Sequence, residues 1–170
     1  MNLQKLHKTF MEQEIKPYIT QKSLNLISKH KKQGDYCLII TATNLFITGP
    51  IAQYLGMDDI IATVPEIKDG EYTGKVEGIP SFQEGKVERL AEWLKEHPEL
   101  SLKGSYFYSD SINDLPLLEQ EKMHFDTLFS PPNFHTNNWV FNYFIWLIFF
   151  HLCYLLYNNN EYKSSGHSGR

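Results

Sequence analysis

The chain has 170 residues and a net charge of −4, with no run of basic side chains. This length accommodates one ordinary domain with a hydrophobic core. The charge argues against nucleic acid as the main partner, because binding to a phosphate backbone needs a basic surface. The first residues lack the apolar stretch of a secretory signal, so we expect a cytoplasmic setting for the first two-thirds of the chain.

The two cysteines, Cys37 and Cys153, lie far apart and have no metal-ligand spacing. Cys37 sits inside an apolar run. This position favours a buried, reduced thiol over a metal ligand or a nucleophile.

The first elements alternate between helix and strand. Residues 3–32 have a helical pattern, which Pro17 divides into two pieces and which ends in basic residues before Gly34. Residues 36–41 form an unbroken apolar run, which predicts a strand buried on both faces of a parallel sheet. Residues 47–55 predict the helix that follows.

The next elements continue this alternation. They are a β-hairpin of residues 60–64 and 72–76 around Asp69 and Gly70, an amphipathic helix of residues 84–97, a strand of residues 105–109 and a helix of residues 113–121. Strands that alternate with helices predict a doubly wound α/β domain.

Two candidate phosphate contacts follow from this arrangement, because ligands bind beyond the carboxyl ends of the strands in such sheets. The hydroxyl of Thr41 and the backbone N–H groups of Ala42 and Thr43 are suited to hold phosphate oxygens, although a Thr-rich helix cap is the alternative. Lys86 opens a helix, where a cation does not favour the helix dipole and is more useful for an anion. A solvated lysine is the alternative there.

A candidate metal site follows the strand of residues 105–109. Asp110 and Asp114 are four residues apart at the start of a helix, which places them on one face, and Asn113 lies between them. Mg²⁺ typically takes one or two carboxylates and keeps positions for water and substrate phosphate. The alternative is an aspartate that only caps the helix.

The order and spacing of these segments resemble the haloacid dehalogenase (HAD) superfamily, in particular its type IB hydrolases related to phosphoserine phosphatase. The resemblance extends from about residue 10 to residue 120. The matching segments are residues 38–44 (second motif), 85–86 (third motif) and 109–114 (fourth motif), with further likeness at residues 43–52, 72–74 and 78–80.

The resemblance implies a Mg²⁺-dependent phosphomonoester hydrolase that acts on a small phosphorylated metabolite. Thr41 would hydrogen-bond the transferring phosphoryl group, Lys86 would neutralise its charge and Asn113 would contact phosphate. Asp110 would ligate Mg²⁺ directly, and Asp114 would position the metal or its water. The implied fold is a partial Rossmann-like parallel sheet with helices on both faces.

The first motif of that family is absent from this sequence. It is a strand that ends in Asp-x-Asp-x-Thr and carries the nucleophilic aspartate, whereas the acids before Thr41 are Glu12, Glu14 and Asp35, none of them at the end of an apolar strand. Without a nucleophile, phosphoenzyme chemistry cannot proceed. We therefore expect a fragment that is inactive alone, with a gap in its sheet where the central strand is missing.

The resemblance also suggests how the chain is divided. Residues 1–34 would be the remnant of a helical cap, residues 35–121 a partial hydrolase core and residues 122–170 a divergent tail. Within the tail, residues 139–157 are almost all apolar and long enough for a transmembrane helix. Out-of-frame translation of AU-rich sequence is the interpretation we favour for this tail. A membrane-anchored, non-catalytic phosphate-binding module is the alternative function.

Overall fold

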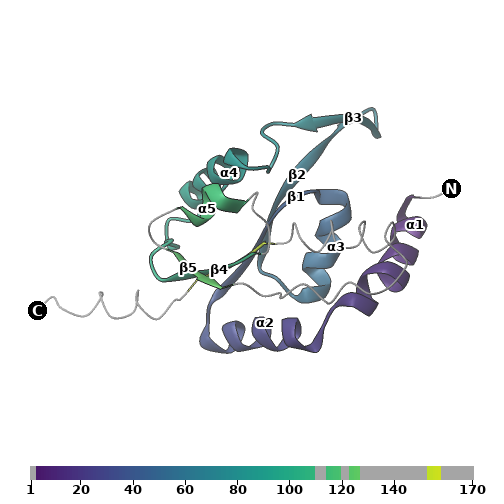
Figure 1. Ribbon diagram of the computed structural model, residues 1–170. Helices are drawn as coiled ribbons and strands as arrows, with labels where there is room; N and C mark the ends of the chain where they lie inside the picture. The colour runs from purple at the N-terminus through teal and green to yellow at the C-terminus, as the bar shows by residue number, and fades with distance from the viewer. Residues whose placement is uncertain (1–2, 110–113, 120–122, 127–152, 158–170) are drawn as a thin grey trace, which may run out of the picture.

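A computed structural model describes residues 3–109, 114–119, 123–126 and 153–157 of the chain (Figure 1). These residues form an α/β fold in which helices pack on a mixed six-stranded sheet. The helices are α1 (Leu3–Phe10), α2 (Gln21–Gln33), α3 (Leu45–Leu55), α4 (Glu84–Glu96) and α5 (Leu115–Leu118). The strands are β1 (Tyr36–Asn44), β2 (Asp59–Lys68), β3 (Glu71–Glu77), β4 (Ser105–Tyr108), β5 (Met123–Asp126) and β6 (Cys153–Tyr157). The α/β class expected from the sequence is confirmed.

The helical pattern of residues 3–32 is interrupted where the proline predicted a break. A π-helical turn, Met11–Ile15, and a 3₁₀ turn, Lys16–Tyr18, separate α1 from α2, and Pro17 lies in the second of these turns. Thr20 then caps α2, because its hydroxyl accepts a hydrogen bond from the backbone N–H of Ser23.

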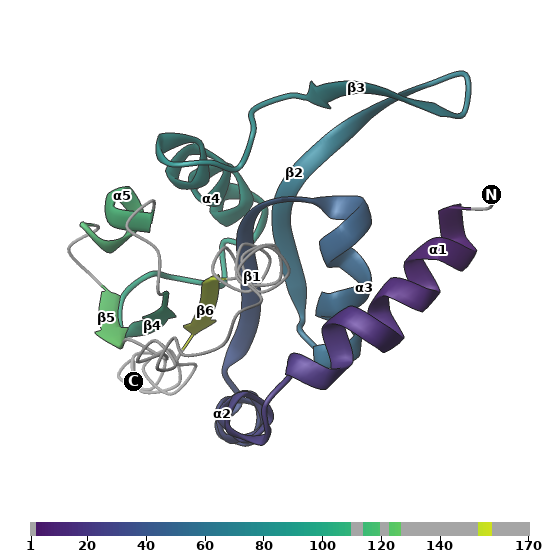
Figure 2. The same cartoon turned by 45° about the vertical axis from the view of Figure 1, so that its right-hand side comes forward.

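The strand order is β3-β2-β1-β6-β4-β5. β1 pairs with β2 in parallel and β4 with β5 in parallel, whereas β6 is antiparallel to both β1 and β4. β1 and β4 therefore run in the same direction, and their carboxyl ends lie at the same edge of the sheet. Figure 2 shows β6 between them.

The position of β6 shows that two predictions from the sequence are wrong. The sheet has no gap between β1 and β4, because β6 hydrogen-bonds to both and so covers two edges that would otherwise be unpaired. The apolar segment 139–157 has the length of a membrane-spanning helix, one of the two readings of the tail, but Cys153–Tyr157 form a strand; residues 139–152 lie outside the described residues. Within the described ranges, none of the helices has the length and apolar character needed to cross a bilayer.

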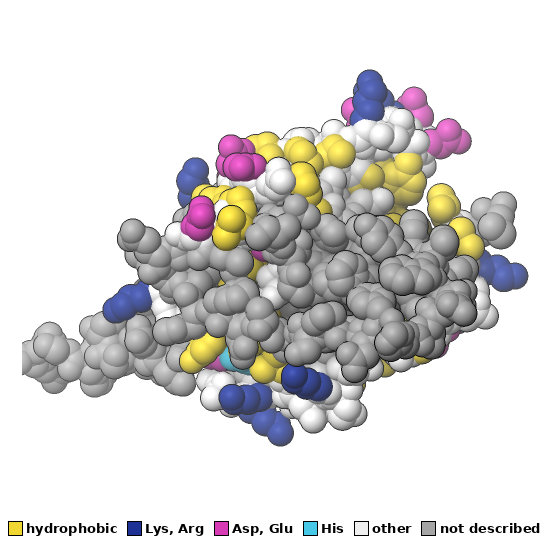
Figure 3. All heavy atoms as spheres, in the orientation of Figure 1, with side chains coloured by type: hydrophobic (Ala, Val, Ile, Leu, Met, Phe, Trp, Pro, Cys, Tyr) yellow, Lys and Arg dark blue, Asp and Glu magenta, His cyan; other side chains and the backbone are white. Residues whose placement is uncertain are grey.

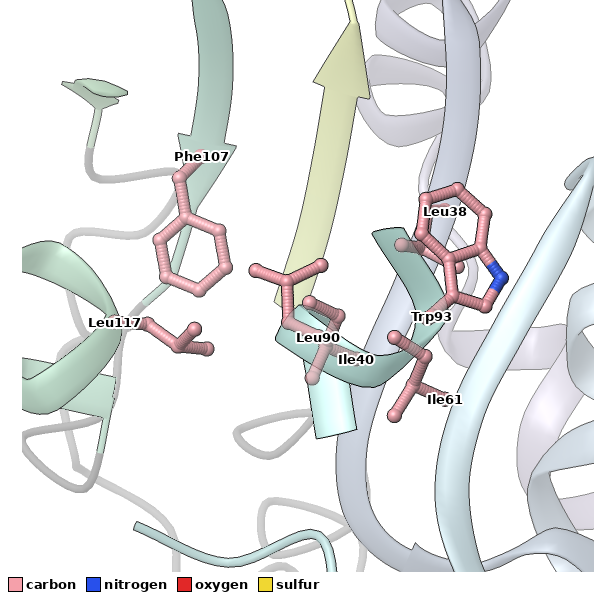
Figure 4. Close-up of a cluster of buried hydrophobic side chains, with 7 residues drawn as sticks. All are labelled: Leu38, Ile40, Ile61, Leu90, Trp93, Phe107 and Leu117. Carbon is pink, nitrogen blue, oxygen red and sulfur yellow. The ribbon is translucent and has the colours of Figure 1, made fainter. Parts of the chain in front are cut away.

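The core lies on both faces of β1, as the unbroken apolar run predicted. Leu38 and Ile40 point to one face, and Ile39 points to the other. The first face holds the cluster shown in Figure 4, which β1, β2, β4, α4 and α5 supply together: Leu38, Ile40, Ile61, Leu90, Trp93, Phe107 and Leu117. The second face packs against α3 and the segment after α1, through Met11, Ile15, Ile27, Ile39, Ile51, Ala52 and Leu55.

The hairpin of β2 and β3 extends beyond the sheet. Its turn residues, Asp69 and Gly70, have φ angles of 52° and 81°, the left-handed values that a tight two-residue hairpin turn needs. Every residue of β3 is exposed. Charged side chains gather at the tip, above a stretch of hydrophobic ones, at the upper right of Figure 3.

Position 85, in the first turn of α4, requires glycine because the backbone of the preceding loop comes very close to it. A Cβ atom there would lie 2.2 Å from the carbonyl oxygen of Pro80. A backbone atom cannot move aside as the end of a flexible side chain does, so any larger residue must displace the loop before α4.

Cys37 is a free thiol with no exposed surface, as the sequence predicted. Burial, with a further contribution from the carboxylate of Asp58, raises the pKa of the Cys37 thiol to about 12. The reactive thiolate is therefore almost absent near neutral pH.

We expect native Cys37 to resist alkylation. With iodoacetamide at pH 8, modification of Cys37 should be at least about a hundredfold slower in buffer than in urea, because both the thiolate fraction and access are low. Peptide mapping by mass spectrometry distinguishes Cys37 from Cys153. Equal rates in the native and unfolded states would show that the thiol is not buried.

Gly85→Ala should lower the free energy of unfolding by about 1–3 kcal/mol, as expected for overpacking against backbone. Glu88→Ala, an exposed change in the same helix, should stay within about 0.5 kcal/mol of the unaltered chain. Urea denaturation of the three proteins measures both effects. The close approach is refuted if Gly85→Ala and Glu88→Ala are equally stable.

Candidate active site

A fully buried ion pair joins the start of α4 to the start of α5. The Nζ of Lys86 donates to Oδ1 of Asp114, and neither side chain has any exposed surface. Lys86 lies in the first turn of α4, and Asp114 directly precedes α5. The alternative of a solvated lysine is therefore wrong.

Stability does not explain this pair. Burying two charges costs several kcal/mol per ion, and their mutual attraction offsets this only when the geometry is very good. A cation in the first turn of a helix also opposes the helix dipole. A charge held at this cost is typical of a site that handles another charge.

Ser109 completes the surroundings of the carboxylate. It directly follows β4, it is 4% exposed, and its hydroxyl donates to Oδ2 of Asp114. Both oxygens of Asp114 are therefore hydrogen-bonded. Sequence reasoning assigned no role to Ser109, although a polar residue directly after a strand was an available signal.

Thr41 lies in β1 and is fully buried. Its hydroxyl accepts a hydrogen bond of 3.1 Å from the backbone N–H of Thr43. The helix cap that the sequence offered as the alternative is provided instead by Asn44, whose Oδ1 accepts from the N–H of Ile47. Ala42 and Thr43 are half-buried beside it.

The sheet register relates Thr41 to Ser109. Ile39 of β1 and Tyr108 of β4 both pair with Tyr154 of β6, so they lie at the same level in the sheet. Thr41 and Ser109 both come just after that level, toward the same carboxyl edge. The convergence of Thr41 and Lys86 on one ligand remains a prediction.

Two predicted site residues, Asp110 and Asn113, lie outside the described residues. Among the residues that the structure does describe, no three His, Cys, Asp or Glu side chains gather as metal ligands. The atoms at this edge are nevertheless hard oxygen donors, the carboxylate of Asp114 and the hydroxyls of Ser109 and Thr41, and such donors suit Mg²⁺.

The loop before α4 holds another polar residue that sequence reasoning missed. The backbone N–H of Ser81 donates to the hydroxyl of Thr63 over 3.1 Å, and Thr63 pairs with Asn44 of β1. The Ser81 hydroxyl is fully buried, and within the described ranges it has no hydrogen-bond partner. Buried hydroxyls are usually satisfied. No sequence pattern marks this serine.

Known proteins resemble this chain over about half to two-thirds of its length. A histidinol-phosphatase from Neisseria meningitidis is 44% identical over 119 residues, which cover 68% of this chain and 54% of that protein. A phosphoserine phosphatase, SerB1, from Mycobacterium tuberculosis is 36% identical over 93 residues, covering 55% and 30% respectively. A crystal structure of a protein of unknown function from Bordetella pertussis Tohama I is 48% identical, with a TM-score of 0.65, and the match covers 69% of this chain and 53% of that one.

The chain thus spans about half the length of the first of these relatives and of the solved structure. A family model for haloacid dehalogenase-like hydrolases matches residues 3–119, which include β1, α4 and β4 with the buried lysine between them. The resemblance found in the sequence is confirmed: the chain belongs to the haloacid dehalogenase-like hydrolases.

Proposed function

We propose that this chain is the phosphate-binding part of a Mg²⁺-dependent phosphomonoester hydrolase. The observation that carries the proposal is the buried Lys86–Asp114 pair at the carboxyl edge of the sheet. An ammonium group that the protein already holds in place can stabilise an anion without reorganisation when the anion binds. Phosphoryl transfer depends mainly on positioning and charge stabilisation of this kind.

The proposed roles follow from where the residues lie. Lys86 balances the charge of the phosphate oxygens, while Asp114 and the hydroxyl of Ser109 keep its ammonium group in place. Thr41, with the N–H groups of Ala42 and Thr43, binds the phosphate from the end of β1. Asn113 is proposed as a further phosphate contact.

Asp110 is proposed as a direct ligand of Mg²⁺, with Asp114 as the residue that positions the metal or its water. When bound, Mg²⁺ would neutralise charge on the phosphate oxygens. The two hydrogen bonds already made by Asp114 support a positioning role over direct ligation.

The names of the relatives support a substrate class. Histidinol phosphate and phosphoserine are both phosphate monoesters of small amino alcohols, and the relatives are named for acting on them. We propose a substrate of this class.

We further propose that this chain binds phosphate but does not hydrolyse phosphate monoesters by itself. Its 170 residues contain no Asp-x-Asp-x-Thr sequence. The strand between β1 and β4 is β6, whose residues Cys153–Tyr157 include no carboxylate. The division into a cap remnant (1–34), a core (35–121) and a divergent tail (122–170) belongs to the same proposal, and the cytoplasmic setting stays a prediction.

Phosphate binding should depend on the buried pair. The double variant Lys86→Met/Asp114→Asn removes both charges together, so neither is left buried alone. Its affinity for inorganic phosphate in the presence of MgCl₂ should fall about ten- to a hundredfold, the value of hydrogen bonds to a charged group. Isothermal titration calorimetry on the full chain measures this.

Lys95→Met is the matched control for that experiment, because Lys95 is an exposed lysine in the same helix. It should bind phosphate as the unaltered chain does, and circular dichroism should show that all the proteins are folded. The proposal is wrong if the unaltered chain binds no phosphate, or if the double variant binds it equally well.

The full chain should not hydrolyse p-nitrophenyl phosphate or histidinol phosphate with Mg²⁺. Loss of a nucleophile costs on the order of 10⁶ in rate by analogy with the serine protease triad, so product release should match the buffer background. Malachite green detection of phosphate checks this. Turnover that Asp110→Asn abolishes would contradict the expected inactivity.

A further inference from the structure

A second buried polar network lies on the other side of β4 from the ion pair. Nδ1 of His30 is 2.7 Å from Oδ2 of Asp35, and Nε2 of His30 is 3.0 Å from the hydroxyl of Tyr108. The three residues are 3%, 6% and 6% exposed. They come from the last turn of α2, the residue before β1 and the last residue of β4.

The imidazole can hold both partners in either charge state. The N–H at Nδ1 donates to the carboxylate of Asp35, and Nε2 either accepts from the Tyr108 hydroxyl, in the neutral ring, or donates to it, in the protonated ring. The ring also packs against Tyr106 and Tyr108, with centroids 5.5 and 5.8 Å away, which limits its rotation. The network therefore holds the Tyr108 hydroxyl at a defined place.

The network lies on the other side of β4 from the proposed phosphate site, so it does not contact a ligand bound there. It is also costly to maintain: Oδ1 of Asp35 is buried and, in the described part of the chain, has no partner. An unsatisfied buried oxygen costs about 1–3 kcal/mol. This cost indicates a task beyond stabilising the fold.

The order of residues along the chain indicates what this task is. Tyr108 is followed directly by Ser109, and consecutive residues at the end of a strand point to opposite faces. Fixing Tyr108 on one face therefore sets the backbone from which Ser109 reaches Asp114 on the other.

We propose that the His30–Asp35 pair is a positioning device that, through Tyr108, fixes the end of β4 at the proposed phosphate site. The link between the end of β4 and phosphate binding rests on the proposed function. The pair is not catalytic; it sets where Ser109 directs its hydroxyl, and so where Asp114 holds the ammonium group of Lys86.

The test is Tyr108→Phe, which removes the hydroxyl and keeps the ring. Tyr36→Phe is the matched control, because Tyr36 is in β1, which β6 separates from β4, and its ring packs against Trp93 and not against the network. In the full chain with MgCl₂, Tyr108→Phe should weaken the binding of inorganic phosphate about three- to tenfold, while Tyr36→Phe leaves it unchanged.

A second readout needs no ligand. Amide hydrogen exchange followed by NMR should be faster at Ser109 in Tyr108→Phe, relative to Ile39 of β1, and should not change in Tyr36→Phe. A merely structural role would raise exchange at both amides together. Should Tyr108→Phe fail to fold, Asp35→Asn tests the same chain of contacts, because it replaces the charged acceptor of the His30 Nδ1–H by a neutral one.

The outcomes separate the two proposals. If the unaltered chain binds phosphate but Tyr108→Phe binds it as tightly and Ser109 exchanges at the unaltered rate, the positioning role is overturned and the proposed function stands. If the unaltered chain binds no phosphate, the proposed function fails, and the exchange rate at Ser109 alone decides the positioning role.

Discussion

The placement of one lysine inside the protein constrains the rest of this structure. Lys86 has no exposed surface, so its charge needs a fixed partner, and Asp114 provides it from the start of α5. That requirement ties α4 to the end of β4 through Ser109. The close approach of Gly85 to Pro80 sets where α4 begins, and therefore where the lysine enters the fold.

The two faces of the sheet make different contributions around this pair. One face buries the cluster of Leu38, Ile40 and Phe107 against α4 and α5, the two helices at whose starts the ion-pair residues lie. The other face carries the His30 network, which reaches the same strand end from behind. The end of β4 is thus held from both sides by polar contacts, while ordinary packing fills the space between.

The middle of the sheet is where this chain departs most from what its sequence led us to expect. β6 pairs with β1 and β4 and closes the sheet, yet it runs antiparallel to both. Hydrogen bonding of the two strand edges is satisfied by any apolar extended segment, so backbone pairing is complete without a catalytic side chain.

The sequence alone determined the α/β class, the strand buried on both faces and the lysine at the start of α4, because these depend on local periodicity and on residues a few positions apart. The tertiary structure decided the partners: Asp114 lies 28 residues from Lys86, and Tyr108 lies 78 residues from His30. It also decided that Cys153–Tyr157 form a strand, since an apolar run is equally suited to a helix or a buried strand until a neighbouring edge requires hydrogen bonds. Spacing along the chain carries no information about such pairings; only the packing of β1, β4 and α4 brings these groups together.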